Sequence, residues 1–330
     1  MKTDFAKVID SFSNYKVMII GDVMIDSYLW GKVERISPEA PVPVVTRTSE
    51  ENRLGGAANV ALNIQSLGAT PILCSVIGND LRSKTLYELL ENKNITAEGI
   101  IEDNNRVTTV KTRIISNHQQ LLRIDRELDH PLSQEMEIKF ISHIFKVLND
   151  NKIDSIIFED YDKGSITPKV IQEIVDEASK RGIPTLVDPK KRNFCEYNNT
   201  TLFKPNFKEL NEGLNVETNK ANPETLFEAA KILHDKNNIS LIMITLSEAG
   251  VFISTGKGYR IIPAHFRAIA DVSGAGDTVI SVASLCLASG LDPFETAVIS
   301  NMAGGLVCEK VGVVPIDKEL LKAEIASLKM

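Results

Sequence analysis

The sequence predicts an α/β fold, a three-layer α/β/α sandwich with a second, smaller β-sheet. Short apolar runs rich in Val and Ile alternate with amphipathic stretches along most of the chain. With 330 residues, of which 43% are hydrophobic, the chain can bury a large core, and we expect one domain over residues 1–330. Two strand-like segments, at about 29–47 and 107–126, break the alternation and predict the smaller sheet.

The main sheet is expected from short apolar runs, which read as buried strands because they are too short and too β-branched for helices. These runs are Lys16–Ile20, Pro71–Ile77, Ile153–Phe158, Pro184–Val187 and Ser240–Leu246. Helical spacing is found at Ala57–Leu67, Leu81–Asn92, Gln134–Leu148, Thr167–Arg181 and Pro223–His234. In such folds ligands gather at the carboxyl ends of strands. Polar residues stand at those ends at Gly21-Asp22, Glu159-Asp160, Asp188-Pro189-Lys190 and Lys204-Pro205-Asn206.

The two exceptional segments leave two arrangements open. Residues 29–47 are rich in Val and Pro, and 107–126 contain a strand-like run that no helix follows. They form either a small separate sheet or an extension of the main sheet.

The composition excludes several classes of protein. A net charge of −7 argues against a nonspecific nucleic-acid binder. No stretch approaches the roughly 20 apolar residues of a membrane span, and the first residues lack the apolar core of a signal peptide, so we expect a cytoplasmic protein. The four cysteines lack metal-site spacing and are expected to be free thiols, mostly buried.

The most informative motif is Gly274-Ala275-Gly276-Asp277, which precedes an apolar helical run. Its glycines permit a tight turn and leave N–H groups free at a helix N-terminus, where the helix dipole favours phosphate oxygens. Asp277 would repel a phosphate, but it suits a base that accepts a proton from a substrate hydroxyl during phosphoryl transfer. A helix cap with Asp in the first turn is the structural alternative.

This motif resembles the signature of the ribokinase-like (PfkB) sugar kinases. Residues 21–45, which begin Gly-Asp-Val-Met-Ile-Asp, are similar to the heptose 7-phosphate kinases of lipopolysaccharide precursor synthesis, and further matches lie at 55–61, 111–123 and 160–164. The resemblance covers nearly the whole chain. It implies a ribokinase-like fold whose small sheet is a lid over the sugar and, in many members, the dimer contact. It also implies transfer of the ATP γ-phosphoryl group to the C1 hydroxyl of D-glycero-β-D-manno-heptose 7-phosphate.

The resemblance also implies residues for the sugar. Asp22 is expected to bind sugar hydroxyls, Asp26 is a second candidate, and Gly55, Gly56 and Asn59 should approach the sugar closely. The 7-phosphate needs positive charge far from Asp277, because an enclosed dianion without a partner is costly. The basic candidates are Arg113 and Lys163 first, then Arg35, Lys111 and Arg123, each of which could equally be a surface cation.

On the nucleotide side, Asn206 and Glu209 match the Asn-x-x-Glu element, so Glu209 is expected to act on Mg²⁺, if need be through water. Lys190 could neutralise the transferring phosphoryl group. Further nucleotide-binding residues are expected at Thr245, Ser247, Gly250, Gly274, Gly276 and Asn301. Ser247 stands where many members have Gly, and Gly304 and Gly305 fit close helix packing better than a nucleotide contact. Some relatives also use a monovalent cation.

Fused members of the family carry a nucleotidyltransferase with a His-x-Gly-His motif, and the five histidines never take that spacing. We therefore expect kinase activity only, with adenylyl transfer by a separate protein. The alternatives are another sugar kinase of this fold, acting on a hexose or fructose 6-phosphate, or a noncatalytic sugar-binding regulator.

Overall fold

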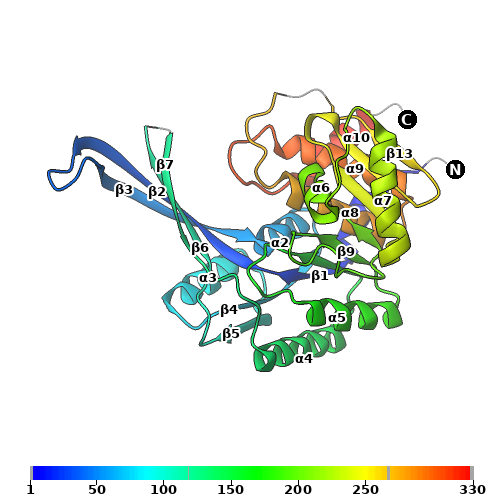
Figure 1. Cartoon of the computed structure of the whole chain (residues 1–330), viewed down its shortest axis with the longest axis horizontal. Helices are drawn as coiled ribbons and strands as arrows, with labels where there is room; N and C mark the ends of the chain where they lie inside the picture. Colours follow the sequence, from blue (N-terminus) through cyan, green and yellow to red (C-terminus); the bar gives the residue numbers. More distant parts are fainter. Residues whose placement is uncertain (1–2, 118, 266–267, 328–330) are drawn as a thin grey trace.

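The structure is a computed structural model that describes residues 3–117, 119–265 and 268–327. Its main sheet has nine strands in the order β13-β12-β11-β10-β9-β8-β1-β4-β5 (Figure 1). They are β1 (Lys16–Gly21), β4 (Thr70–Gly78), β5 (Gly99–Asp103), β8 (Ser155–Glu159), β9 (Thr185–Asp188), β10 (Leu202–Phe203), β11 (Leu241–Thr245), β12 (Val251–Ser254) and β13 (Tyr259–Ile262). The strands from β11 to β5 are parallel, whereas β12 pairs antiparallel with β11 and β13 pairs antiparallel with β12.

Helices cover both faces of this sheet, which confirms the three-layer sandwich. One face packs on α1 (Phe5–Ser11), α2 (Ala57–Ser66), α3 (Leu81–Asn92), α8 (Ala275–Ala288), α9 (Pro293–Val307) and α10 (Lys318–Ser327). The other packs on α4 (Gln134–Asp150), α5 (Pro168–Arg181), α6 (Phe207–Leu214) and α7 (Pro223–Asn237). In β1, Val17 and Ile19 face the first layer, whereas Met18 and Ile20 face the second. A strand buried on both faces is apolar at every position, as the sequence indicated.

The five predicted strands and five predicted helices are all present, with ends that move by up to three residues. The helix expected from Thr167 begins at Pro168, because the Thr167 side chain caps the helix by accepting a hydrogen bond from the Val170 amide. Strands β5, β12 and β13 were not predicted, since each is only four or five residues long and carries a weak apolar signal.

The two exceptional segments form a separate four-stranded sheet, in the order β3-β2-β6-β7, so they do not extend the main sheet. Its strands are β2 (Val23–Ile36), β3 (Pro43–Gly56), β6 (Val110–Ser116) and β7 (Gln119–Arg126). Figure 1 shows it projecting from the sandwich as a long ribbon. Strands β2 and β3 reach further toward the main body than the expected 29–47, so Asp26, Gly55 and Gly56 lie at the base of this sheet. His118, inside the second segment, lies outside the described residues.

Within the described part of the chain, no helix is both long and apolar enough to cross a bilayer. All four cysteines are free thiols there, as expected; Cys74 and Cys286 are buried, Cys308 is half-buried and Cys195 is exposed.

Candidate active site

Asp277 lies in the first turn of α8, directly after the tight turn at Gly274. Gly274 caps the helix with φ of +80°, a backbone conformation that side chains disfavour. The Asp277 carboxylate is 7% exposed and accepts hydrogen bonds from Asn59 Nδ2 at 2.6 Å and from the Tyr161 hydroxyl at 3.1 Å. Both donors come from other segments, α2 and the loop after β8. Asp277 therefore belongs to a site formed between elements, which argues against the helix-cap alternative.

The electrostatic surroundings suit a proton acceptor. Burial raises the pKa of Asp277 to about 6, with a further contribution from the Asp188 charge, while the Asn59 hydrogen bond and Lys204 oppose the rise. A carboxylate with this pKa is ionised at neutral pH, yet it is more basic than an exposed aspartate.

A buried ion-pair network stands beside Asp277 at the ends of β9 and β10. Lys204 is 2% exposed, and its Nζ lies 2.7 Å from Asp188 Oδ2. Lys190 Nζ lies 2.5 Å from Glu209 Oε1 and 3.6 Å from Asp188 Oδ1. Burial alone would lower the pKa of Lys190, but the Asp188 and Glu209 carboxylates raise it overall, so this ammonium stays charged.

Asn206 and Glu209 begin α6 with reciprocal hydrogen bonds. Asn206 Oδ1 accepts from the Glu209 amide at 2.9 Å, and Glu209 Oε2 accepts from the Asn206 amide at 2.8 Å. This capping box fixes the Glu209 carboxylate at the mouth of the cleft, with its second oxygen on Lys190. Both oxygens are engaged, so a hydrated cation such as Mg²⁺ would be met there through water.

A cleft of about 660 Å³ extends from Asp277 along the ends of β9 to β12. Seven of the expected nucleotide-binding residues line it: Lys190, Asn206, Thr245, Ser247, Gly250, Gly276 and Asn301. Gly274 does not line it; a Cβ there would lie 3.2 Å from Asn59 Nδ2. Ser247 has φ of +57°, the left-handed conformation that glycine adopts easily.

Helix α9 carries Asn301, an expected nucleotide-binding residue, and the pair Gly304 and Gly305, which were expected to serve close helix packing. Asn301 donates to the carbonyl oxygen of Pro263 at 2.9 Å, so it holds the segment after β13 against the cleft. A Cβ on Gly304 would lie 2.7 Å from Val279 Cγ2, which agrees with close packing of α9 on α8, although Gly304 and Gly305 also line the cleft.

The structure gives Asp22 a different position from the one expected for a sugar ligand. Its carboxylate is 2% exposed and accepts three backbone N–H bonds, from Tyr161 at 3.1 Å, Lys163 at 3.0 Å and Ser165 at 3.0 Å. Asp22 therefore holds the loop that presents Tyr161 to Asp277. A short carboxylate that closes a loop from inside has few lone pairs left for sugar hydroxyls.

Asp26 is the better placed of the two aspartates. Its Oδ1 accepts from Arg113 Nη1 at 2.6 Å across β2 and β6. A Cβ on Gly55 would lie 2.2 Å from Asp26 Oδ2, so the absence of a side chain at Gly55 makes room for this carboxylate. Asn59 contacts Asp277 directly.

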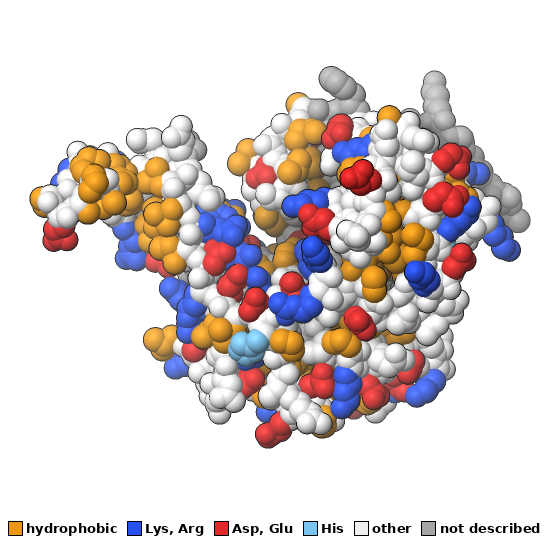
Figure 2. Space-filling view, in the orientation of Figure 1, with side chains coloured by type: hydrophobic (Ala, Val, Ile, Leu, Met, Phe, Trp, Pro, Cys, Tyr) orange, Lys and Arg blue, Asp and Glu red, His pale blue; other side chains and the backbone are white. Residues whose placement is uncertain are grey.

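The basic candidates separate into two groups. Lys163 Nζ lies 2.8 Å and Lys111 Nζ 3.9 Å from the Glu127 carboxylate, at the base of the small sheet near Arg113. Arg123 pairs with Asp125 at 2.8 Å on β7, and Arg35 is exposed near the tip of the sheet. Figure 2 shows Lys, Arg, Asp and Glu side chains gathered in the hollow between this sheet and the main body.

Comparison with known proteins agrees with this geometry. The profile of the family described as pfkB family carbohydrate kinase matches residues 14–319. The chain belongs to this family. The pfkB fold and site therefore make this protein a sugar kinase, as the sequence resemblance implied.

Similar pfkB kinases include two curated proteins named bifunctional protein HldE. The one from Helicobacter hepaticus is 39% identical over 90% of this chain, and the one from Aliarcobacter butzleri is 41% identical over 90%. The chain spans 61% of the length of each. Among solved structures, Escherichia coli phosphofructokinase-2 with potassium has a TM-score of 0.77 and 18% identity, covering 94% of this chain and 99% of that one. Arabidopsis thaliana ribokinase with ribose and ATP has a TM-score of 0.69 and 16% identity, covering 93% and 98%. At these identities the two structures show the shared fold.

Sequence reasoning missed four residues of this kinase site. Tyr161 donates to Asp277. Glu159, Asp188 and Lys204 stood at predicted strand ends, but no role was assigned to them. The strand order β10-β9-β8 places these three ends side by side, and that order is the signal the sequence did not supply.

Proposed function

We propose that this sugar kinase transfers the γ-phosphoryl group of ATP to the C1 hydroxyl of D-glycero-β-D-manno-heptose 7-phosphate, giving the 1,7-bisphosphate. The observation that carries the chemistry is the buried Asp277 carboxylate where the cleft meets the first turn of α8. The heptose assignment rests on the residues at 21–45 and 160–164 and on the similarity to the HldE proteins.

The chain's own groups divide the work of phosphoryl transfer. Asp277 accepts the proton of the attacking hydroxyl, and the N–H groups at Gly274, Ala275 and Gly276 stabilise the charge that develops on the phosphoryl oxygens. Lys190 lines the cleft and neutralises further charge there. Tyr161 donates to Oδ1 and Asn59 donates to Oδ2, so these two bonds orient the Asp277 carboxylate and its remaining lone pairs face the acceptor.

ATP and Mg²⁺ are the proposed cosubstrate and metal, and a monovalent cation is a further proposed ligand. When bound, Mg²⁺ would supply positive charge against the nucleotide phosphates. Glu209 would hold it through water, because its two oxygens already meet Lys190 and the α6 amide. Asn206, Thr245, Ser247, Gly250 and Asn301 are proposed to bind the nucleotide along the same wall.

The 7-phosphate is proposed to lie at the base of the small sheet, which then acts as a lid. Arg113, Lys111 and Lys163 gather there, and the only carboxylates that an ion pair assigns to these three cations in the described structure belong to Asp26 and Glu127. A phosphate dianion would take over these cations as a stronger partner. The Asp26 carboxylate, released from Arg113, is then free to accept sugar hydroxyls, with Gly55 beside it. Gly56 and Asn59 are proposed to approach the same sugar.

The outer face of the lid is proposed to pair with a second copy of the chain. By the register of β2, β6 and β7, the side chains of Leu29, Ile114 and Leu122 share one face, with Ile124 beside them, and the face that carries Arg113 is the opposite one. Leu122 and Ile124 are about half exposed. Apolar side chains gathered on one side of a projecting sheet favour burial in a dimer.

Adenylyl transfer is proposed to require residues outside this sequence, because its histidines lack the His-x-Gly-His spacing. The curated relatives are named bifunctional and extend beyond the matched region. That a separate protein performs this later step stays a prediction, tested by offering heptose 1-phosphate and labelled ATP to the chain and looking for incorporated AMP.

The decisive test is ATP turnover with Mg²⁺ against heptose 7-phosphate, fructose 6-phosphate and ribose, with phosphorus NMR of the product. A heptose 1,7-bisphosphate signal formed selectively supports the proposal. Turnover on another sugar alone would keep Asp277 as base but reject the heptose assignment. No turnover on any of the three would favour a sugar-binding regulator.

A further inference from the structure

Arg106 is a buried arginine in the loop between β5 and β6, and it does not line the cleft. It is 7% exposed. Its guanidinium donates to two backbone carbonyl oxygens, that of His130 at 3.1 Å and that of Lys163. A planar fork of donors fixes the segments whose carbonyls it binds. Arg106 therefore joins its own loop to two others, at 127–132 and 160–165.

The loop at 160–165 is bound from its other side by Asp22. This carboxylate accepts from the amides of Tyr161, Lys163 and Ser165. The N–H of Lys163 is thus bound by Asp22 and its C=O by Arg106. Burial lowers the pKa of Arg106, and the charge of Asp22 opposes this, so the two buried groups also stabilise each other.

The same loop has a backbone that needs such support. Asp162 and Gly164 both have positive φ, +58° and +88°. A Cβ on Gly164 would collide with the carbonyl oxygen of His130, and the Leu132 amide donates to the carbonyl of Gly164 at 3.2 Å. Sparsely populated backbone conformations persist where the surrounding structure over-determines them. Arg106 supplies part of that constraint, because it binds both segments at their point of contact.

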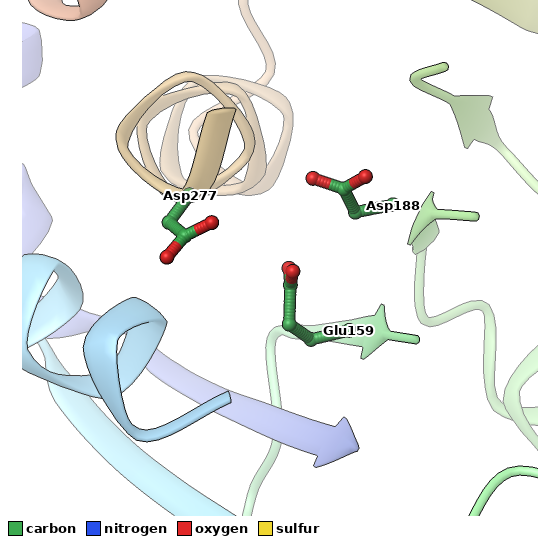
Figure 3. Close-up of side chains that lie close together, drawn as sticks. All are labelled: Glu159, Asp188 and Asp277. Carbon is green, nitrogen blue, oxygen red and sulfur yellow. The ribbon is translucent and has the colours of Figure 1, made fainter. Parts of the chain in front are cut away.

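The two segments joined by Arg106 lead to opposite ends of the site. Tyr161 follows β8 by two residues, and Figure 3 shows the end of β8, at Glu159, beside Asp277. The Tyr161 hydroxyl donates to Asp277 Oδ1 at 3.1 Å. On the other side, Glu127 pairs with Lys163 Nζ at 2.8 Å, at the base of the small sheet. Arg106 thus stands behind both the contact to Asp277 and the basic group.

We propose that Arg106 is a positioning residue for phosphoryl transfer, which binds the carbonyls of His130 and Lys163 and so sets the loop that brings Tyr161 to Asp277. The inference rests on the proposed role of Asp277 as base, but it does not depend on which sugar is phosphorylated. Arg106 acts through the loop and does not touch the substrate. A lysine cannot replace it, because one ammonium on a flexible chain does not present a rigid fork to two carbonyls.

The first test is the kinetics of Arg106→Met, with whichever of the three sugars offered above the wild type phosphorylates. The substitution removes both hydrogen bonds, so kcat should fall about tenfold to a hundredfold, the order of loss expected when a group is misplaced by about 1 Å. KM for ATP and for the sugar should change little. Tyr161→Phe should lower kcat through the same contact, and the double variant should fall no further than the worse single variant.

The acid limb of the pH profile is a readout that a loss of stability alone does not move. Burial raises the pKa of Asp277 to about 6, and the Tyr161 hydrogen bond opposes the rise. Loss of that bond should therefore move the limb of kcat/KM to higher pH in Arg106→Met and in Tyr161→Phe alike. Arg181→Met is the matched control, because Arg181 also donates to a backbone carbonyl, that of Leu148 at 2.9 Å, at the end of α5. It should lower Tm and leave kcat and the limb unchanged.

Amide hydrogen exchange follows the loop without using activity. In Arg106→Met the amides of Tyr161, Lys163 and Ser165 should exchange faster than in the wild type, and in Arg181→Met they should not. If Arg106→Met does not fold, Arg106→Lys takes its place with the same expectations.

The proposal is overturned if the Arg106 variant keeps the wild-type kcat, or if its loss adds to that of Tyr161→Phe. A raised KM for the sugar with unchanged kcat would also overturn it, because Arg106 would then act in substrate binding. Turnover retained by Asp277→Asn would reject the proposed base. Faster exchange at 161–165 with unchanged kcat would reject only the positioning role, so the two failures are distinguishable.

Discussion

The inner end of the cleft and the projecting small sheet, which is the proposed lid, differ in how completely their polar groups are satisfied by the protein. Around Asp277 the side chains are buried and held from several elements at once, with Asn59 on α2, Tyr161 after β8 and Lys204 on the segment after β10. In the lid, β7 is exposed along its whole length and the ion pair of Arg123 with Asp125 lies within one strand.

The difference separates two requirements of one reaction. Some groups accept a proton or stabilise charge that develops during the reaction. They are more effective when they are fixed before the substrate arrives, because no free energy is then spent on reorienting them during the reaction. Groups that capture a substrate must exchange partners, and the Arg113–Asp26 and Lys163–Glu127 pairs at the lid base are placed for such an exchange. Substitutions in the first region should therefore lower kcat, and those in the second should raise KM.

The largest effect is expected for Asp277→Asn, which keeps the side-chain shape but removes the base. General base catalysis contributes about 100-fold or more, so kcat should fall at least that far while ATP binding stays nearly intact. Single-turnover kinetics and nucleotide titration measure the two quantities. Turnover above about a tenth of the wild type would contradict the assigned role.

Arg113→Met tests the lid base with a side chain of similar length and no charge. Loss of a charge-assisted contact to phosphate costs about 1.5–3 kcal/mol, so KM for the sugar phosphate should rise roughly tenfold to a hundredfold with little change in kcat. Arg35→Met, near the exposed tip, is the matched control. A fall in kcat with unchanged KM would contradict this role and would mean that Arg113 acts in the chemical step, like the groups around Asp277.

Asp22 and Asp26 provide the sharpest comparison between the two regions. Asp22→Asn leaves one acceptor oxygen for three backbone N–H groups, so we expect a stability loss of about 2 kcal/mol and a lower kcat through the loop that carries Tyr161. Asp26→Asn should instead raise KM with Tm nearly unchanged. Denaturant unfolding and steady-state kinetics separate the two, and the opposite pattern would restore Asp22 as a sugar ligand.

The pH dependence of kcat/KM should report the ionisation of Asp277, which belongs to the fixed region around the inner end of the cleft. Its pKa, raised by burial to about 6, lies above the usual aspartate value, so the base is ionised above that pH and protonated below it. At saturating MgATP, kcat/KM should be flat near neutrality and fall below pH 6, approaching tenfold per unit. The acid limb should disappear from the residual activity of Asp277→Asn, and a profile flat down to pH 5 would contradict the assignment.

Local patterns predicted more of this molecule than contacts between distant segments did. Buried strands and capped helices follow from periodicity, and the turn at Gly274 follows from two glycines before an apolar run, so much of the lining of the cleft was predictable. The hydrogen bond between Asn59 and Asp277 joins residues 218 positions apart. The sequence pointed to these two residues only because each belongs to a motif that resembles the family.

The missed residues and the unexpected contacts of Asp22 share a cause. Glu159 meets Asp188 because β8 pairs with β9, and strand order cannot be read from single strands. Asp22 was expected to contact sugar because it follows a strand, but the loop at 161–165 folds back onto it and takes its oxygens. A polar residue at a strand end is as well placed to hold a neighbouring loop as to hold a ligand.

The smallest effect on turnover is expected at the outer face of the lid, from the double substitution Leu122→Ser and Ile124→Ser. Each side chain is about half exposed, and burial of such a residue contributes roughly 1.5–3 kcal/mol when complete. In a symmetric dimer each substitution acts twice, so the Kd of the dimer should rise a hundredfold or more. The value of kcat should stay near that of the wild type. Sedimentation measures the first and ATP turnover the second. Leu320→Ser, an exposed apolar residue on α10, is the matched control. If the double variant remains a dimer, its partner surface lies elsewhere; if it becomes monomeric and also loses kcat, the lid is coupled to the fixed region and the two regions are not separable.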